Sequence, residues 1–393
     1  TLPEDGWVAV KRRELREVIQ SCAGLWIEAS ADGFSAAPGD SIPFRITVVN
    51  RSAQPFVLEK AACPECGYIC EGKRELEDNA PSAISGTLRI PAAKAISQPY
   101  WLEAPFSEGM FTVSDQRMIG AAENAPAICF LISLNCGGIS LEYPAPLTFR
   151  WTDRAEGELT RPFEIRPPAT VNFEENVCVF GNRGPKTIAV RVKGNIPRAA
   201  GTVRLSGPKA WKIEPPAAPF SIEEKYGEQR IVFTVSPPPD AGQAILNADI
   251  ETGGKHYDRA LVEIAHPHMK NQIYFPKSVL KTVKLENGYH GGAIGYIMGS
   301  GDEVPEALRS LGCDVTLLDD QALTTGNLAS FQTIITGVRA YNTRGILRHV
   351  QPRLLEYVRN GGTLIVQYNT PSGLLINSIG PYPFTLGNDR VCV

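Results

Sequence analysis

The feature that most constrains this chain is a change in the spacing of its apolar residues. In the first two thirds the period is two, as in Ile42, Phe44, Ile46 and Val48, which is the pattern of half-buried strands. After about residue 268, short apolar runs alternate with helical stripes instead. Because 393 residues are too many for one hydrophobic core, the sequence predicts a multidomain protein, with β domains first and an α/β domain last.

Residues 1–25 are predicted to form a connector helix, and residues 26–165 a β-sandwich. In the connector, four apolar residues at helical spacing favour a helix over 10–23: Leu15, Val18, Ile19 and Cys22. In the sandwich, Ile128, Phe130, Ile132 and Leu134 alternate, and Gly137-Gly138 can close a hairpin onto the next strand. No helical pattern competes there, so one antiparallel sandwich is expected.

Two further domains are expected after this sandwich. Arg166-Pro167-Pro168 reads as a linker, and residues 166–267 form a smaller immunoglobulin-like β-sandwich with Ile188, Val190 and Val192 pointing inward. Residues 268–393 are predicted to form a flavodoxin-like parallel α/β domain, because strands alternate with helices. Four strands are visible, which is few for such a domain, so we expect it to be incomplete. They lie at 294–298, 315–318, 333–338 and 363–368, with a helix from Pro352 to about Asn360.

Charge and hydropathy exclude two classes of partner. The formal net charge is −3 and no extended block of Lys and Arg runs along the chain, so nucleic acid and anionic membrane surfaces are not expected to bind. No apolar run approaches the roughly 18 residues that a membrane-spanning helix needs. The protein is therefore expected not to span a membrane.

Polar residues gather where the predicted parallel strands end, which is where open α/β sheets bind ligands. The candidate ligand-binding residues on this rim are Asp302, Glu303, Arg339, Tyr341, Asn342, Arg344, Gln367 and Asn369. Asp302 and Glu303 begin a helix, so capping is an alternative role for them. The others could equally anchor a neighbouring domain.

The spacing of Cys63, Cys66 and Cys70 resembles half of a zinc site. Structural zinc has four ligands, usually two such pairs or a Cys pair with a His pair. The first domain has no second pair and no histidine, so no metal is expected. A disulfide in the loop and free thiols stay open as alternatives.

Other segments with chemical potential are expected to be structural. Ala265-His266-Pro267-His268 lacks a following carboxylate, and the proline should splay the two imidazoles apart, so this stretch reads as a linker between domains. No G-x-S-x-G elbow is present, and no catalytic residue is predicted. Pro99-Tyr100-Trp101-Leu102 could be sandwich core or a surface that faces carbohydrate, and core is favoured.

Several longer segments resemble the region that follows the catalytic domain in large bacterial PIG-L (LmbE-like) family N-deacetylases. They are residues 25–29, 98–102, 149–153, 295–308, 337–344 and 361–369, which include Gly295-Tyr296-Ile297-Met298-Gly299 and Gly337-Val338-Arg339-Ala340-Tyr341. The resemblance covers nearly the whole chain, the connector helix included. It also implies that the last domain is similar to class I glutamine amidotransferases, and that the protein is periplasmic or extracellular.

The resemblance implies a function for the parent enzyme that this chain does not carry out alone. In that family an Ala-His-Pro-Asp-Asp-Glu motif holds zinc, which activates water to remove an N-acetyl group from a sugar. Ala265-His266-Pro267 lacks the two Asp and the Glu, so no residue here inherits that site, and zinc is expected only in the missing catalytic domain. The amidotransferase nucleophile is missing as well.

The leading hypothesis is therefore an accessory, substrate-positioning region of a secreted zinc-dependent N-acetylglucosaminide deacetylase. Its partners would be its own missing catalytic domain and an N-acetylated sugar or glycoconjugate. The alternative is a stand-alone glycan-binding module that uses the rim of the α/β domain. A third possibility, that the α/β domain is itself an enzyme, needs a nucleophile or metal set that the sequence does not supply.

Overall fold

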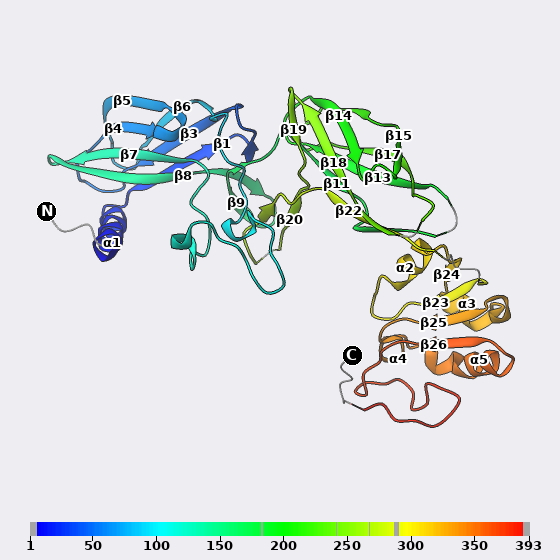
Figure 1. Ribbon diagram of the computed structural model, residues 1–393. Helices are drawn as coiled ribbons and strands as arrows, with labels where there is room; N and C mark the ends of the chain where they lie inside the picture. The colour runs from blue at the N-terminus through cyan, green and yellow to red at the C-terminus, as the bar shows by residue number, and fades with distance from the viewer. Residues whose placement is uncertain (1–5, 182–183, 241, 267, 287–290, 388–393) are drawn as a thin grey trace.

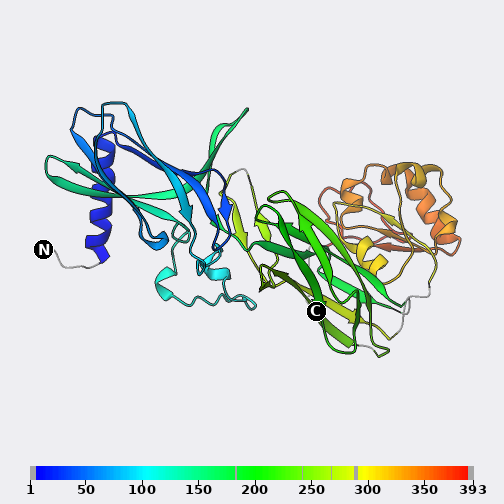
Figure 2. The ribbon, with the colours of Figure 1, turned by 90° about the horizontal axis from the view of Figure 1, so that it is seen from above.

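The computed structural model describes residues 6–387, apart from 182–183, 241, 267 and 287–290. Three domains follow one another along an elongated molecule (Figure 1), and the view from above shows the same succession (Figure 2). Ahead of them lies helix α1 (Gly6–Cys22), which starts four residues before the predicted helix and buries none of its residues. No described helix is long and apolar enough to cross a membrane.

The first domain is a β-sandwich, as predicted. Its strands are β1 (Trp26–Ala31), β3 (Ser41–Val49), β4 (Phe56–Cys63), β5 (Tyr68–Glu75), β6 (Pro81–Arg89), β7 (Cys129–Cys136), β8 (Ile139–Asp153) and β9 (Gly157–Pro162). The hydrogen-bonded order is β5-β4-β7-β8-β1-β3-β6, with β9 also on β8. Strand β8 belongs to both layers, because its first half pairs with β7 and its second half with β1 and β9.

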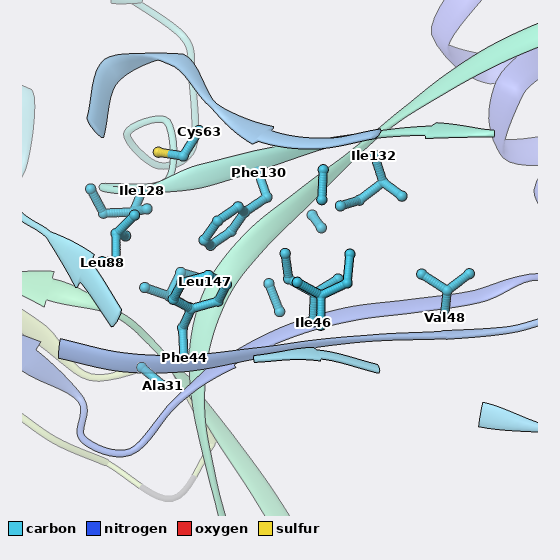
Figure 3. Packing of buried hydrophobic residues seen from close by; sticks show 14 of the residues in the cluster. Ala31, Phe44, Ile46, Val48, Cys63, Leu88, Ile128, Phe130, Ile132 and Leu147 are labelled. Atoms are coloured by element: carbon cyan, nitrogen blue, oxygen red, sulfur yellow. The ribbon is translucent and has the colours of Figure 1, made fainter. Parts of the chain in front are cut away.

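The alternating residues that predicted this sandwich form its core. Phe44 and Ile46 on β3 face Phe130 on β7 across the gap between the layers (Figure 3). Ile46 and Phe130 are fully buried. The edge-to-face contact of Phe44 with Tyr68, whose ring centroids are 4.9 Å apart, extends the core toward β5. The core therefore follows directly from the period-two pattern.

The second domain is also a two-layered β-sandwich. Its strands are β11 (Ala169–Phe173), β12 (Val177–Phe180), β13 (Lys186–Gly194), β14 (Ala199–Ser206), β15 (Lys212–Glu214), β16 (Ala218–Ile222), β17 (Glu228–Ser236), β18 (Gly242–Thr252), β19 (Lys255–Tyr257) and β22 (Val279–Lys284). One sheet has the order β11-β13-β17-β15, and the other β12-β22-β18-β14-β16 with β19 on β18. Val190, Val192, Phe233 and Leu246 are fully buried between them, and the alternation predicted this for Val190 and Val192 of β13.

This sandwich extends beyond the expected boundary at residue 267. Strand β22 pairs antiparallel with β18 and parallel with β12, so the sheet is incomplete without residues 279–284. The hairpin of β20 (Val262–Ile264) and β21 (Gln272–Tyr274) lies between β18 and β22 in the sequence. The change of apolar period comes earlier than the end of the sheet because a hairpin interrupts the last strands.

The third domain has a parallel sheet with helices. Its elements are β23 (Ile294–Ile297), α2 (Val304–Ser310), β24 (Val315–Leu317), α3 (Asp320–Thr325), β25 (Thr333–Thr336), α4 (Ala340–Thr343), α5 (Leu347–Arg359) and β26 (Thr363–Val366). The four predicted strands are all present, in the order β24-β23-β25-β26, and every pair is parallel. The strands and the parallel pairing expected for this part of the chain are therefore present, and the flavodoxin-like fold stays a prediction.

Helix α5 differs from the prediction at its start. It begins at Leu347, and Pro352 lies inside it rather than at its first turn. A proline inside a helix costs about 3 kcal/mol. Leu347, Val350 and Leu354 are buried at helical spacing on one side of the helix, and this apolar contact holds the preceding turn in helical form despite the proline.

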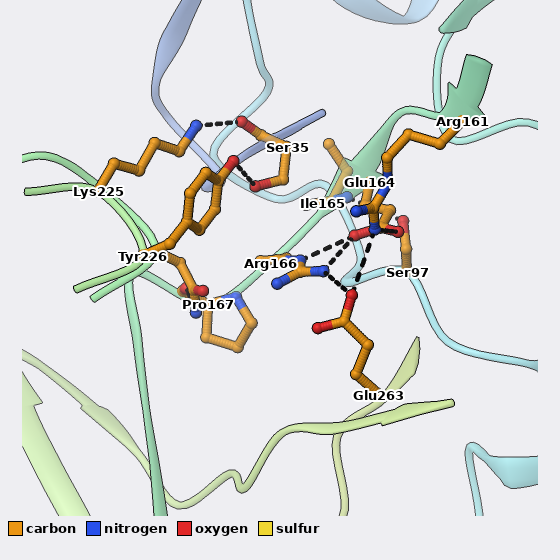
Figure 4. A network of polar contacts seen from close by, with 11 residues as sticks. Ser35, Ser97, Arg161, Glu164, Ile165, Arg166, Pro167, Lys225, Tyr226 and Glu263 are labelled. Atoms are coloured by element: carbon orange, nitrogen blue, oxygen red, sulfur yellow. Dashed lines mark hydrogen bonds and ion pairs between the residues drawn. The ribbon is translucent and has the colours of Figure 1, made fainter. Parts of the chain in front are cut away.

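The two sandwiches are joined by a buried network of charges (Figure 4). Arg166, which was expected in a linker, is 1% exposed. Its Nε donates to Glu164 at 2.8 Å, and Arg161 donates to the other oxygen of Glu164 at 2.6 Å. Glu263 lies 3.5 Å from Arg161 and 3.6 Å from Arg166. Two cations and two carboxylates therefore balance each other where the first domain meets the second.

Aromatic stacking reinforces this joint. The ring of Phe34, from the first domain, stacks on Tyr226 of the second with centroids 4.4 Å apart and planes 11° from parallel. The Arg161 guanidinium lies 4.0 Å from the centre of the Phe34 ring. The hydroxyls of Tyr226 and Ser35 are 2.9 Å apart. Contacts of this kind fix the relative position of the two sandwiches and of anything bound between them.

Candidate functional site

The rim of the α/β domain is built around Asp302. One of its carboxylate oxygens accepts from the Tyr296 hydroxyl at 2.6 Å and from the Val304 N–H at 3.1 Å, and the other accepts from the Val338 N–H at 3.1 Å. Burial, followed by the neighbouring Asp302 carboxylate, raises the pKa of Tyr296 well above its usual range. Asp302 thus ties the loop after β23 to the loop after β25.

Glycines let these two loops approach each other. A Cβ on Gly299 would lie 2.1 Å from the Val338 carbonyl oxygen, and a Cβ on Gly337 would lie 2.8 Å from the Asp302 carboxylate. Gln367 completes the contact by donating to the Tyr296 hydroxyl at 2.7 Å. The polar groups of this half of the rim are therefore bonded mainly to one another.

The polar groups in the other half of the rim are also hydrogen-bonded to neighbouring residues. Tyr341 is fully buried, and its hydroxyl lies 2.8 Å from the Gln351 side-chain oxygen. Burial raises the pKa of Tyr341 to about 12, and the hydrogen bond to Gln351 opposes the shift. Asn369 accepts from the Tyr341 N–H at 3.0 Å, and Asn342 donates to the carbonyls of Thr370 and Ser372.

Three candidates lie at the periphery. Arg344 forms an ion pair with Asp320 at the start of α3. Glu303 precedes α2 but makes no capping bond. Arg339 is exposed and has left-handed backbone dihedrals, with φ of 58°. Among the described residues, the side chains of Glu303 and Arg339 have no hydrogen bond or ion pair. The sequence analysis missed Tyr368, which is 66% exposed and accepts the Arg339 N–H through its carbonyl.

The structure therefore brings the eight predicted residues to one edge of the sheet but commits most of them to other bonds. Tyr341 points into the core, and Asn342, Gln367 and Asn369 hold loops together. Among the described rim residues, only Glu303 and Arg339 offer free charged groups, and the exposed Tyr368 bonds to the Arg339 N–H through its backbone carbonyl. A ligand-binding role of this rim stays a prediction, and it rests on those three side chains.

A hollow lies between the first sandwich and the hairpin β20–β21. It has a volume of about 820 Å³, which is within the range of ligand pockets. Its walls come from four separate segments: 94–103, 113–127, 160–164 and 270–273, with a few residues of β8 and Glu65. We call this hollow the interdomain cleft.

Three aromatic residues line the interdomain cleft: Phe163, Tyr100 and Trp101. The core was the favoured prediction for Tyr100 and Trp101. Tyr100 and Trp101 lie in the short helix η2 (Tyr100–Leu102) and are partly buried. Their rings meet edge to face with centroids 4.9 Å apart. The Tyr100 hydroxyl donates to the Ala121 carbonyl at 3.1 Å, which fixes its ring. The indole N–H of Trp101 has no hydrogen-bond partner among the described residues.

Paired charges and amides surround these rings. Lys270 and Glu123 form an ion pair of 3.0 Å across the cleft, joining the β20–β21 hairpin to the 113–127 loop. Asn124 fixes that loop by donating to the Gln98 carbonyl at 2.9 Å. The Asn271 and Gln272 side chains, also in the wall, make no hydrogen bond within the described residues. The cleft thus combines an aromatic surface with free planar amides.

Two histidines lie near this hairpin, His266 and His268. Pro267 lies outside the described residues, but the rings of His266 and His268 lie nearly parallel with centroids 5.8 Å apart. The two imidazoles are therefore not splayed apart, although the proline between them was expected to splay them. The described residues place no carboxylate or cysteine with them in a group of potential ligands. His256 instead pairs with Asp249 at 2.7 Å, which raises its pKa.

Comparisons with known proteins give no family. No protein-family model matches the chain, and no curated protein matches it. Among solved structures, red sea bream transglutaminase is 13% identical with a TM-score of 0.28, over 72% of this chain and 34% of that one. A Salmonella alpha-2-macroglobulin mutant is 9% identical with a TM-score of 0.22, over 66% of this chain and 16% of that one.

The match to a third structure extends over nearly the whole length of that protein. It is a Porphyromonas gingivalis protein of unknown function, 10% identical with a TM-score of 0.19, over 66% of this chain and 98% of that one. The chain spans about a third of the transglutaminase and less of the alpha-2-macroglobulin. At such scores these likenesses carry no argument about function.

Proposed function

We propose that this chain is a non-catalytic, substrate-positioning part of a PIG-L-type deacetylase and that it binds carbohydrate in the interdomain cleft. The observation that carries the proposal is the pair of aromatic side chains, Tyr100 and Trp101, in the wall of an 820 Å³ cleft. The segment Gln98–Leu102 is also one of those that resemble the PIG-L accessory region.

Carbohydrate suits this cleft for chemical reasons. A sugar ring has an apolar face of C–H groups and an edge of hydroxyls, so it binds where an aromatic face lies beside polar groups. Tyr and Trp supply such faces with few rotatable bonds. The unpaired Trp101 N–H and the amides of Asn271 and Gln272 can bond to hydroxyls or to an N-acetyl group.

The accessory role is supported by apolar surface near the cleft. The loop between β6 and β7 exposes Phe106, Met110, Phe111 and Ile119, each by more than half of its surface. Exposed large apolar residues in one loop are typical of a contact with another domain or protein. We propose that this loop contacts the catalytic domain, and that the α/β domain, whose strand order is also that of flavodoxin-like folds, supports the assembly.

Changing Trp101 to alanine is expected to weaken carbohydrate binding at least about tenfold, because removal of an aromatic anchor commonly costs more than about 1.4 kcal/mol. Isothermal titration of the chain with an oligomer of N-acetylglucosamine measures this affinity. Trp151→Ala is the matched control, since Trp151 is 37% exposed on β8 and is not part of the cleft wall. It should bind as the wild type does.

The same titration separates the cleft from the rim of the α/β domain. If Arg339→Ala abolishes binding while Trp101→Ala leaves it intact, the rim is the site and the cleft proposal fails. If the wild-type chain binds no N-acetylated oligosaccharide, carbohydrate is the wrong class of ligand.

The non-catalytic part of the proposal has its own test. The chain should release no acetate from N-acetylglucosaminides, either with added zinc or after treatment with a chelator. Acetate release by the purified chain would contradict an accessory role even if the cleft binds sugar.

A further inference from the structure

The short segment that connects β4 to β5 brings three potential metal ligands together. Cys63 ends β4, the 3₁₀ helix η1 (Pro64–Cys66) follows, and β5 begins at Tyr68. The sulfurs of Cys63 and Cys66 and a carboxylate oxygen of Glu65 all lie within 4.8 Å of one another. Both cysteines are free thiols. The expectation of no metal was based on Cys and His alone and did not consider the Glu65 carboxylate.

The backbone of this segment makes a tight turn between β4 and β5. Gly67 has left-handed dihedrals, with φ of 63°, and its N–H returns to the Pro64 carbonyl at 3.1 Å. This tight turn brings Cys66 back beside Cys63, so that the two sulfurs lie within 4.8 Å of each other. Metal is bound by the thiolate form of cysteine.

The three ligand atoms are close enough to approach one tetrahedral ion. Zinc binds thiolate sulfur at about 2.3 Å, so two sulfurs on one tetrahedral ion lie about 3.8 Å apart. The three ligand atoms, already within 4.8 Å, need to move by about 1 Å or less. Two thiolates with one carboxylate favour zinc over the harder ions magnesium and calcium. We propose that Cys63, Glu65 and Cys66 form a zinc-binding site.

Lys94 makes the proposal more specific. Its ammonium group pairs with the Glu65 carboxylate and is 22% exposed, so in the metal-free chain a lysine neutralises the charge that zinc would use. Glu65 and Lys94 both line the interdomain cleft, so the site borders that cleft. Zinc and the ammonium compete for one carboxylate, and removal of Lys94 should therefore strengthen zinc binding. The proposal does not depend on carbohydrate binding in the cleft.

The test uses the full chain, reduced with a thiol-free reductant and then stripped of metal. Cobalt(II) is the spectroscopic probe, because thiolate ligands give it a charge-transfer band and tetrahedral geometry gives it strong visible bands. We expect one equivalent of cobalt to bind with both features and to be displaced by zinc. Lys94→Met should bind zinc about tenfold more tightly, and Cys66→Ser and Glu65→Gln at least about tenfold more weakly.

Cys136→Ser is the matched control, because Cys136 is a partly buried thiol at the opposite end of the strand pair β4–β7. It should leave the cobalt spectrum unchanged. Absence of a thiolate band in the reduced wild type, or a band that survives Cys66→Ser, would overturn the proposal. Folding of each variant is checked by tryptophan fluorescence, so that a loss of metal binding is not confused with unfolding.

Discussion

Changing Glu164 to glutamine is expected to lower the free energy of unfolding of the two sandwiches by about 3 kcal/mol or more. Glu164 is 5% exposed and bonds to both Arg161 and Arg166. Removal of its charge leaves the buried Arg166 guanidinium without its closest counter-ion, and breaking a buried ion pair in this way typically costs about 3–5 kcal/mol. Urea denaturation followed by tryptophan fluorescence measures the effect, since all five tryptophans precede the α/β domain.

An exposed ion pair in the same chain is the control for this experiment. Lys11 and Glu14 on α1 are 2.7 Å apart, but their side chains are 67% and 49% exposed. Glu14→Gln should change the free energy of unfolding by less than about 1 kcal/mol. If Glu164→Gln has an equally small effect, the network in Figure 4 does not hold the sandwiches together.

Changing Gly299 to alanine is expected to destabilise the α/β domain by about 4 kcal/mol or more, because large effects of this kind come from overlaps that the structure cannot relieve. The new Cβ would lie 2.1 Å from the Val338 carbonyl oxygen and 2.8 Å from the Ala340 nitrogen. Both atoms are backbone, so relief requires the loops after β23 and β25 to separate. The bond from the Val338 N–H to Asp302, which joins the two loops, would break as they separate.

Hydrogen exchange measured by mass spectrometry resolves this effect by domain. In Gly299→Ala, β23, β25 and β26 should lose protection while the sandwiches keep theirs. Gly345→Ala is the matched control, since Gly345 is exposed and a Cβ there meets nothing within 4 Å. Unchanged protection of β23 in Gly299→Ala would mean that the two loops are not packed together as described.

The strands could be predicted from the sequence because their signals are local. Alternation over β3, β7 and β13 identified buried residues in both sandwiches. Residues two positions apart in a strand point to the same face of the sheet, so a run of alternating apolar residues marks the buried face. The start of α5 was missed because contacts of Leu347 and Val350 outweigh the local preference of Pro352. Those contacts are with residues far away in the sequence.

The candidate sites were harder to predict, again for a physical reason. Strand ends correctly placed the rim residues together, but a sequence pattern does not show which side chains bond to each other. Tyr341 points inward, and Asn369 accepts the Tyr341 N–H, so neither is free. The interdomain cleft had little signal in the sequence, since its walls come from residues as far apart as Glu65 and Ile273. Only Tyr100 and Trp101 pointed to it.

The most direct test of this account is a crystal structure of the chain soaked with an oligomer of N-acetylglucosamine. We predict density for a sugar ring against Trp101 in the interdomain cleft, with hydrogen bonds to Asn271 or Gln272. Sugar density beside Arg339 and Tyr368 with an empty cleft, or no density at a saturating concentration, would contradict the central claim.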